Sequence, residues 1–471
     1  MVNYKELGFK AGLEIHQQLD IKKLFCDCPS LVNDPNEEFY IVKRKLNITE
    51  GESGKEDVAA RYELSKNKTF FYQAKKTSSC LVELDEEPPH RINEQAIKIA
   101  LQVCKLLNAK IVSEIVFMRK IVLDGSNVSG FQRTALIGRN GHINTSKGKV
   151  SIPTVYLEEE AAKKINENNE SVTYSLDRLG VALLEISTAA ELMDAEYVKE
   201  SASIIGMILR SLEKVKRGIG SIRQDVNLSI KGSPRIELKG FQDLRSMTKV
   251  IENEVERLLK EKDKVPHVRK VEPNLTSTYL RPMPGAARMY PETDVPIFEV
   301  SEKLVDSIKI PELISERAVN FEKKYGINPQ YALEIVKGNL PFDYYAEKYK
   351  IDPKIIAHSL IEIPKELKKR FNFSEELKKE DFDFIFENLE KKKINNEALL
   401  DILYELGKGN KIDLNKYSSL SLNEIEVEVK KTIKENPGVS VNGLMGDLMK
   451  KFKGRVDGKL VISLIKRFKN E

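Results

Sequence analysis

The chain has 471 residues, with 77 Lys and Arg against 72 Asp and Glu, and so a formal net charge of +5. This length is too great for one hydrophobic core, and the near-neutral balance offers no argument for nucleic-acid binding from overall charge. Four cysteines exclude a disulfide framework, and the absence of a signal-like first stretch or an 18-residue apolar run favours a cytoplasmic protein.

The first predicted strand is AGLEIHQQLD, residues 11–20. Strand alternation puts Leu13 and Ile15 on one face and Glu14, His16 and Gln18 on the other. The polar face is either a solvated strand surface or half of a metal and phosphate site. The strand alone favours the solvated surface.

Three cysteines offer thiols to a metal: Cys26 and Cys28 in LFCDCPS, and Cys80 in KKTSSCLVELDEEPP. They could bind zinc with a fourth ligand, but the paired C-x-x-C spacing that makes a zinc prediction strong is absent. Cys104 lies on the apolar stripe of a helix predicted over residues 92–108, with Asn93 as its cap, and is expected in the core.

Further helices are predicted from Asp194 over DAEYVKESASIIGMILRSLEKV and over TKVIENEVERLLKEK. Strands and helices do not alternate regularly, which predicts an α+β fold with a mixed or antiparallel sheet. The segment Arg281–Pro296 holds four prolines and is expected to be irregular chain that closes a first domain over residues 1–300.

Amphipathic helical patterns dominate after residue 300, such as NNEALLDILYELGKG, which Gly407 can end. They predict an all-α helical domain over residues 301–410 and a helical tail domain over residues 411–471. From Lys431 to Glu471 there are ten Lys and Arg against four Asp and Glu. This basic tail suits RNA phosphates, with a solvated helical face as the alternative.

Carboxylates also follow or interrupt two apolar strands. In TVYLEEEAAKK, Glu158 to Glu160 come directly after Val155 and Leu157, and a solvated strand end or helix start is the favoured interpretation. In GVALLEIS, Glu185 stands within an apolar run. A buried carboxylate needs a cation, a metal or a proton, so a functional group and a structural ion pair both remain open.

A hairpin, SIRQDVNLSI-KGSP-RIELKGF, has one polar side. Its first strand puts Arg223, Asp225 and Asn227 on one face, and its second strand contributes residues 235, 237 and Lys239. The alternatives are cross-strand ion pairs, or a charged floor on which cations hold phosphate and Asp and Asn hold metal-bound water.

These segments together resemble a known family. GLEIHQQL, KLFCDCP, CLVELDEEPP, MRKIVLDGSNVSGFQRT, LEEEAAKK, DRLGVALLEIST, RGIGSIRQDVNLSI, RIELKGFQDL and MYPETDVP occur in this order in the B/E subunits of glutamyl-tRNA(Gln) amidotransferase. The motifs DEEPPH, DGSNVSGFQRT and PGAARMYPETD are similar to those of the archaeal E subunit rather than to those of the bacterial B subunit. The resemblance is dense over residues 9–300, and GDLMKKFKGRVDGKLV is similar to the family's tail domain.

The resemblance implies a cradle-like catalytic domain that converts Glu-tRNA(Gln) to Gln-tRNA(Gln). ATP would phosphorylate the γ-carboxylate of the tRNA-bound glutamate, and ammonia from an asparaginase-type partner, the D subunit, would then displace phosphate. Phosphoryl transfer between anions requires Mg²⁺ and cationic residues. The residues that match the family's catalytic magnesium site are Glu14, His16, Glu159 and Glu185.

Other residues have weaker expectations. His16 either binds Mg²⁺ or orients its water, since Mg²⁺ prefers oxygen ligands. By their place on the polar hairpin, Arg223, Asp225 and Lys239 are expected to contact phosphate and metal. Lys120 and Gln132 lie in a matching motif, with no role assigned.

Two departures from the family pattern stand out. The archaeal members carry an aspartyl-tRNA-synthetase-like insert before the RPMPGAARMYPETD motif, and EKDKVPHVRKVEPNLTSTYL leaves no room for it here. The second cysteine pair of the bacterial pattern is reduced to Cys80, which weakens the zinc prediction. A silent tRNA-binding scaffold and a bacterial-type B subunit are the competing hypotheses.

Overall fold

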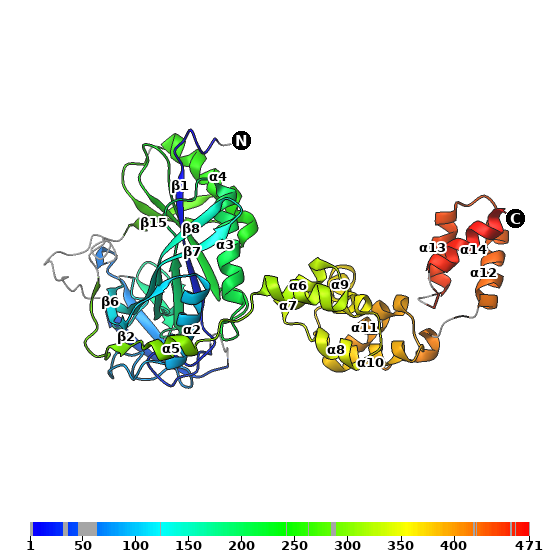
Figure 1. Ribbon diagram of the computed structural model, residues 1–471, viewed down its shortest axis with the longest axis horizontal. Helices are drawn as coiled ribbons and strands as arrows, with labels where there is room; N and C mark the ends of the chain where they lie inside the picture. The colour runs from blue at the N-terminus through cyan, green and yellow to red at the C-terminus, as the bar shows by residue number, and fades with distance from the viewer. Residues whose placement is uncertain are drawn as a thin grey trace. The chain divides into compact units, whose positions relative to one another are not determined.

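Figure 1 shows the computed structural model, which describes residues 3–31, 36–45, 64–122, 124–241, 243–261, 263–283, 289–417, 420, 422–452, 455–456 and 458–470. The chain separates into two compact units, Met1–Leu313 and Ile314–Glu471. The finer division into three domains, with a boundary near residue 410, stays a prediction. No helix within the described part of the chain is long and apolar enough to span a membrane.

A large mixed sheet forms the centre of the first unit, with the strand order β15-β14-β13-β12-β1-β11-β8-β7-β6-β16 and a short strand β4 beside β7. Its strands are β1 (Lys10–Gln18), β4 (Lys110–Ile111), β6 (Phe117–Ile121), β7 (Phe131–Thr145), β8 (Gly148–Glu159), β11 (Ala182–Ser187), β12 (Ile222–Ser229), β13 (Ile236–Lys239), β14 (His267–Val271), β15 (Ser277–Pro282) and β16 (Met289–Pro291). Neighbouring strands run antiparallel, except for the parallel pair β13 and β14. The predicted α+β class is confirmed.

Two smaller sheets complete the strands of this unit. One has the order β2 (Phe39–Lys45), β3 (Thr69–Lys75), β10 (Ser171–Ser175) and β9 (Lys163–Glu167), and the other pairs β5 (Glu114–Ile115) with β17 (Phe298–Glu299). Phe70, Tyr72, Val172 and Tyr174 form a separate apolar cluster on the four-stranded sheet.

Helices cover the apolar side of the large sheet. They are α2 (Glu94–Leu106), α3 (Ala195–Arg210) and α4 (Leu244–Glu261), and a short helix α5 (Glu302–Ser307) follows β17. The Asn93 side chain accepts a hydrogen bond from the Gln95 amide at the start of α2, as its sequence predicts. Leu13 and Ile15 of β1 lie in the core beneath these helices, so the opposite, polar side of the strand faces away from the helices.

The proline-rich segment Arg281–Pro296 is more regular than its composition predicts. Pro282 ends β15, and β16 ends at Pro291, while residues 284–288 lie outside the described residues. Both strands lie at edges of the sheet, where a residue without an N–H group removes no ladder hydrogen bond. The expectation of an irregular segment is therefore wrong for these strands.

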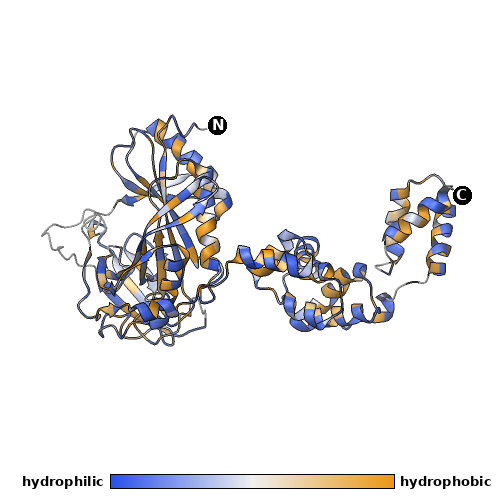
Figure 2. Ribbon diagram, viewed as in Figure 1, coloured by the Kyte–Doolittle hydropathy of each residue, from blue (hydrophilic) through white to orange (hydrophobic). Residues whose placement is uncertain are grey.

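The described residues of the second unit form helices. They are α6 (Ile314–Tyr325), α7 (Pro329–Gly338), α8 (Phe342–Lys348), α9 (Pro353–Phe371), α10 (Lys379–Glu390), α11 (Leu399–Gly407), α12 (Leu422–Glu435), α13 (Val441–Phe452) and α14 (Gly458–Asn470), with short 3₁₀ turns at Asn396–Ala398 and Leu414–Tyr417. Helix α11 ends at Gly407, as predicted. Hydrophobic and hydrophilic residues alternate around these helices in Figure 2, and α12, α13 and α14 share an apolar cluster.

Candidate active site

A cavity of about 690 Å³ opens on the polar side of the large sheet. Strand register explains which side chains line it, because cross-strand partners point to the same face. Glu14 lies opposite Asp225, and His16 lies opposite both Glu185 and Arg223. The alternation predicted for the first strand therefore places Glu14 and His16 on a shared, concave surface rather than on an open solvated face.

The centre of this surface is a cluster of His16, Glu158 and Glu185, whose ligand atoms all lie within 4.8 Å of one another. Lys120 Nζ lies 2.6 Å from Glu158 Oε2 and 3.5 Å from Glu185 Oε2. His16 Nε2 is 3.4 Å from Glu185 Oε2. Five donors and acceptors from β1, β6, β7, β8 and β11 thus meet here, since the Thr134 hydroxyl also donates to Glu158 Oε2 at 3.0 Å.

The charges of this cluster favour the ionised form of Glu185. Burial opposes ionisation, but the hydrogen bond from His16 and the positive charge of Lys120 lower the pKa of Glu185 to about 2. Burial disfavours the charged form of His16, yet the hydrogen bond to Glu185 and its charge raise the pKa of that imidazole above its ordinary value. Two carboxylates and an imidazole can bind a divalent cation, with Lys120 as the counter-ion in this structure.

A second cluster lies on the same face of the sheet, toward β12 and β13, and contains Glu14, Asp225 and Glu237. Lys239 Nζ is 2.6 Å from both Asp225 Oδ2 and Glu237 Oε1. Asn227 Nδ2 donates to Glu14 Oε1 at 3.1 Å. The structure thus groups the predicted residue Glu14 with the hairpin, apart from the triad that contains His16 and Glu185.

The fourth predicted residue, Glu159, is on the opposite side of β8 and does not line the cavity. It accepts a hydrogen bond from the Arg133 amide at 3.2 Å and lies 3.4 Å from the Arg133 guanidinium. Arg133 also contacts Glu292 at 2.8 Å. In the structure Glu158 lies beside His16 and Glu185, and Glu159 does not, so a role of Glu159 at the magnesium site stays a prediction. The two-residue period is the reason for this placement: Val155 and Leu157 are buried in the core, and Glu159 follows them on the same side.

The hairpin residues predicted to contact phosphate, Arg223, Asp225 and Lys239, do line the cavity. They are also engaged in ion pairs: Arg223 Nη2 lies 2.6 Å from Glu160 Oε2, and Lys239 is paired as described above. The cross-strand ion pairs that the sequence left as one alternative are therefore present. A contact of these residues with substrate stays a prediction.

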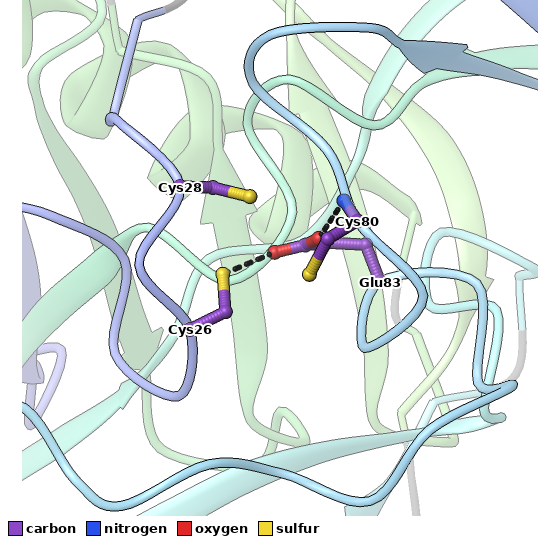
Figure 3. Close-up of side chains that lie close together, drawn as sticks. All are labelled: Cys26, Cys28, Cys80 and Glu83. Atoms are coloured by element: carbon purple, nitrogen blue, oxygen red, sulfur yellow. Dashed lines mark hydrogen bonds between the residues drawn. The ribbon is translucent and has the colours of Figure 1, made fainter.

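Cys26, Cys28 and Cys80 converge with Glu83 into a further potential metal site, outside the cavity (Figure 3). All four ligand atoms lie within 4.8 Å of one another. The Cys26 thiol donates to Glu83 Oε1 at 3.0 Å, and the Cys80 amide donates to Glu83 Oε2 at 2.7 Å. Hydrogen bonds from the neighbouring thiols lower the pKa of Cys28 to about 4, which favours the thiolate that binds metals. Sequence reasoning missed Glu83, although it stands three residues after Cys80.

Comparison with known proteins agrees with the resemblance in the sequence. The family described as the GatB/GatE catalytic domain matches residues 9–306. Two proteins named as the E subunit of glutamyl-tRNA(Gln) amidotransferase are similar to this chain: that of Methanosarcina barkeri is 34% identical over 99% of this chain and 98% of its own length, and that of Methanocaldococcus jannaschii is 33% identical over 99% of each. The E subunit from Saccharolobus solfataricus is 33% identical over 100% of this chain and 99% of its own length.

The length of these alignments bears on the expected insert. The alignment with the Methanosarcina barkeri protein spans 621 positions and this chain has 471 residues, so at least 150 positions have no residue of this chain (621 − 471). The relatives therefore carry residues that are absent here, while the predicted place of the gap, before Arg281, stays a prediction. With its catalytic-domain match and its full-length identity to these proteins, the chain belongs to the GatB/GatE family.

Proposed function

We propose that this chain is the amidating component of a cytoplasmic glutamyl-tRNA(Gln) amidotransferase that converts Glu-tRNA(Gln) to Gln-tRNA(Gln). The name shared by its relatives supports the substrate. The observation that carries the proposal is the cluster of His16, Glu158, Glu185 and Lys120 on the floor of a cavity within the matched catalytic domain.

The proposed reaction has two steps. An oxygen of the tRNA-bound glutamate's γ-carboxylate attacks the γ-phosphorus of ATP, which breaks the bond to the β-phosphate oxygen and releases ADP. Ammonia then attacks the acyl carbon, loses a proton, and expels phosphate with the former carboxylate oxygen. Phosphate leaves more readily than oxide, which is why a carboxylate must be activated before it can form an amide.

The donor set of the cluster fits Mg²⁺, because carboxylate oxygens are preferred ligands and substrate phosphates commonly complete the coordination. Glu158 and Glu185 would hold the ion, and His16 would bind it or orient its water. When bound, Mg²⁺ would offset negative charge between the two reacting anions. Lys120 contributes a further positive charge, since its Nζ already lies between both carboxylates. The cavity volume of about 690 Å³ lies within the usual range for small-ligand sites, which supports ATP as the second substrate.

We further propose that Cys26, Cys28, Cys80 and Glu83 hold a structural Zn²⁺ ion. Three thiolates and a carboxylate are accepted zinc ligands, and four ligands are the number a closed structural site requires. Such a site would tie the loop after β1 to the loop after β3.

Two partners complete the proposal. An asparaginase-type protein, the D subunit of the amidotransferase, would release the ammonia. The basic helices from residue 411 onward would bind tRNA, in keeping with the lysines of α12 that border a groove beside Phe468. A scaffold that only binds tRNA is the alternative, and the convergence of buried acidic groups in the catalytic domain favours the enzyme.

The test is amidation of Glu-tRNA(Gln) by the full-length chain with ATP, Mg²⁺ and either free ammonia or the D subunit. We expect Gln-tRNA(Gln) to form, and the Glu158→Gln, Glu185→Gln double variant to abolish it. Glu256→Gln, at an exposed position on α4, is the matched control and should retain full activity. No product from the unmodified chain with its partner would instead support the scaffold.

A further inference from the structure

The cations that line the active-site cavity differ in what they contact. Lys120 lies 2.6 Å from Glu158, Lys239 lies 2.6 Å from Asp225, and Arg223 lies 2.6 Å from Glu160. Each of these charges is already compensated by a carboxylate. An incoming anion would have to compete with that carboxylate, so these three cations are poor candidates for a preformed anion site.

Two arginines of the same cavity, Arg235 and Arg281, differ from them. Arg235 donates through Nε and Nη2 to Met283 Sδ, at 3.1 and 2.6 Å. A thioether sulfur is neutral and accepts hydrogen bonds only weakly. Arg281 Nε is buried, and none of the described residues accepts a hydrogen bond from it. A buried donor without an acceptor is costly, which suggests that a ligand supplies the acceptor.

The sheet brings these two guanidinium groups to one end of the cavity. Arg235 directly precedes β13 and Arg281 is on β15, with β14 between the two strands. Pro282 lies opposite His267, which lies opposite Ile236, so the two arginines are near neighbours across β14. Strand spacing puts β13 and β15 about 10 Å apart, a span that two long side chains can close upon one anion. The triad of His16, Glu158 and Glu185 lies further along the same surface, on β1, β8 and β11.

We infer that Arg235 and Arg281 form an anion subsite that binds a phosphate group of a substrate. This inference deepens the proposed function and rests on it for the identity of the substrate. A guanidinium presents two parallel N–H groups that match two phosphate oxygens, and Nε of Arg281 with an adjacent Nη offers such a pair. The phosphate belongs either to the triphosphate of ATP or to the acceptor end of the tRNA. A phosphate group from either source would make the same contacts with the two arginines.

Steady-state kinetics of the full-length chain with its ammonia-supplying partner distinguish the two sources. We expect the Arg235→Met, Arg281→Met double variant to raise the KM of one substrate about tenfold or more, with a smaller change in kcat. A rise in the KM of ATP assigns the subsite to the nucleotide, and a rise in the KM of Glu-tRNA(Gln) assigns it to the tRNA. The matched control is Arg245→Met, because Arg245 is an exposed arginine on α4 that pairs with Asp243 outside the cavity.

Two further variants separate ligand binding from folding. Arg281→Lys keeps the charge but loses the planar pair of donors. For the substrate whose KM rises in the double variant, the KM of Arg281→Lys should therefore lie between those of the unmodified chain and the double variant. Arg235→Met alone changes an exposed side chain and should fold normally. If both KM values of the folded double variant stay within about twofold of the unmodified chain, the subsite is refuted.

A binding experiment tests the anion subsite independently of catalysis. Inorganic triphosphate titrated calorimetrically into the full-length chain should bind about tenfold more tightly than it binds the double variant. Equal affinities, or no binding to the unmodified chain, overturn the subsite. Loss of amidation by the unmodified complex would refute the proposed function, whereas this titration would still report on the subsite.

Discussion

Replacing each of two adjacent glutamates by glutamine tests the assignment of the active site. The family pattern assigned the metal site to Glu159, whereas the structure puts Glu158 with His16 and Glu185. Glutamine preserves the size of the side chain and removes its charge. We therefore compare Glu158→Gln with Glu159→Gln.

The contacts of each residue set the expected magnitudes. Glu158→Gln removes one of two carboxylates from the triad, and we expect amidation to fall about 100-fold or more, because loss of supporting groups alone costs roughly 10- to 100-fold at metal sites. Its effect on stability should be small, since Lys120 still has Glu185 at 3.5 Å. Glu159→Gln weakens a buried pair with Arg133, but Arg133 keeps Glu292 at 2.8 Å. We expect a loss of about 1–2 kcal/mol in the free energy of unfolding and a small change in activity.

Two assays check these expectations. Initial rates of Gln-tRNA(Gln) formation give the effect on activity, and denaturant unfolding gives the effect on stability. The reverse result, with Glu159→Gln inactive and stable while Glu158→Gln remains active, would show that the register of β8 in the structure does not describe the working enzyme. Glu256→Gln again serves as the surface control.

Three other predictions address the metal, the pH dependence and the tail. Cys80→Ser should lower the zinc content measured by atomic emission, whereas Cys104→Ser, on the buried face of α2, should not; zinc-free unmodified protein would refute the metal. Burial opposes ionisation of Glu292, but Arg119, the Asp294 amide and Arg133 together lower the pKa of this carboxyl below its ordinary value of 4.5. The carboxylate therefore stabilises the fold fully above pH 4.5, and this stabilisation is lost as the pH falls through the lowered pKa. Glu292→Gln should thus cost about 2 kcal/mol at pH 7, with a gap to the unmodified protein that shrinks in acid unfolding experiments; a constant gap would contradict this. Replacing Lys430 and Lys434 of α12 by glutamine should raise the KM of tRNA but not of ATP, and should flatten the salt dependence of tRNA binding; an unchanged KM would argue for a solvated helical face.

Alternation along β1 and β12 was predictable because each strand has one apolar and one polar side. Leu13 and Ile15 could be assigned to the core, and Glu14 and His16 to the opposite side, from the sequence alone. The same rule would have found Glu158, counted from the buried residues Val155 and Leu157. Glu159 was chosen by family pattern, from a run of three glutamates, without that count, and its role at a magnesium site stays a prediction.

The partners of charged side chains were not predictable. Glu83 completes the group of thiols only because the loops after β1 and β3 meet, and the sequence separates it from Cys26 by more than fifty residues (83 − 26). Likewise, the carboxylate of Glu160 compensates Arg223 across the sheet, while Arg281 Nε is left without an acceptor among the described residues. Such differences depend on distances between strands that lie far apart in the chain.

By itself, the sequence determined the α+β class, the helical character of the chain after about residue 300, and the membership of the family, because periodicity and ordered motifs are local properties. Only the tertiary structure decided that His16, Glu158 and Glu185 meet under Lys120, that Glu14 joins the hairpin cluster instead, and that Glu159 belongs to the buried pair with Arg133. The physical reason is strand order: β1 lies between β11 and β12, which come more than 150 residues later in the chain (182 − 18), and that pairing sets which charges share one surface.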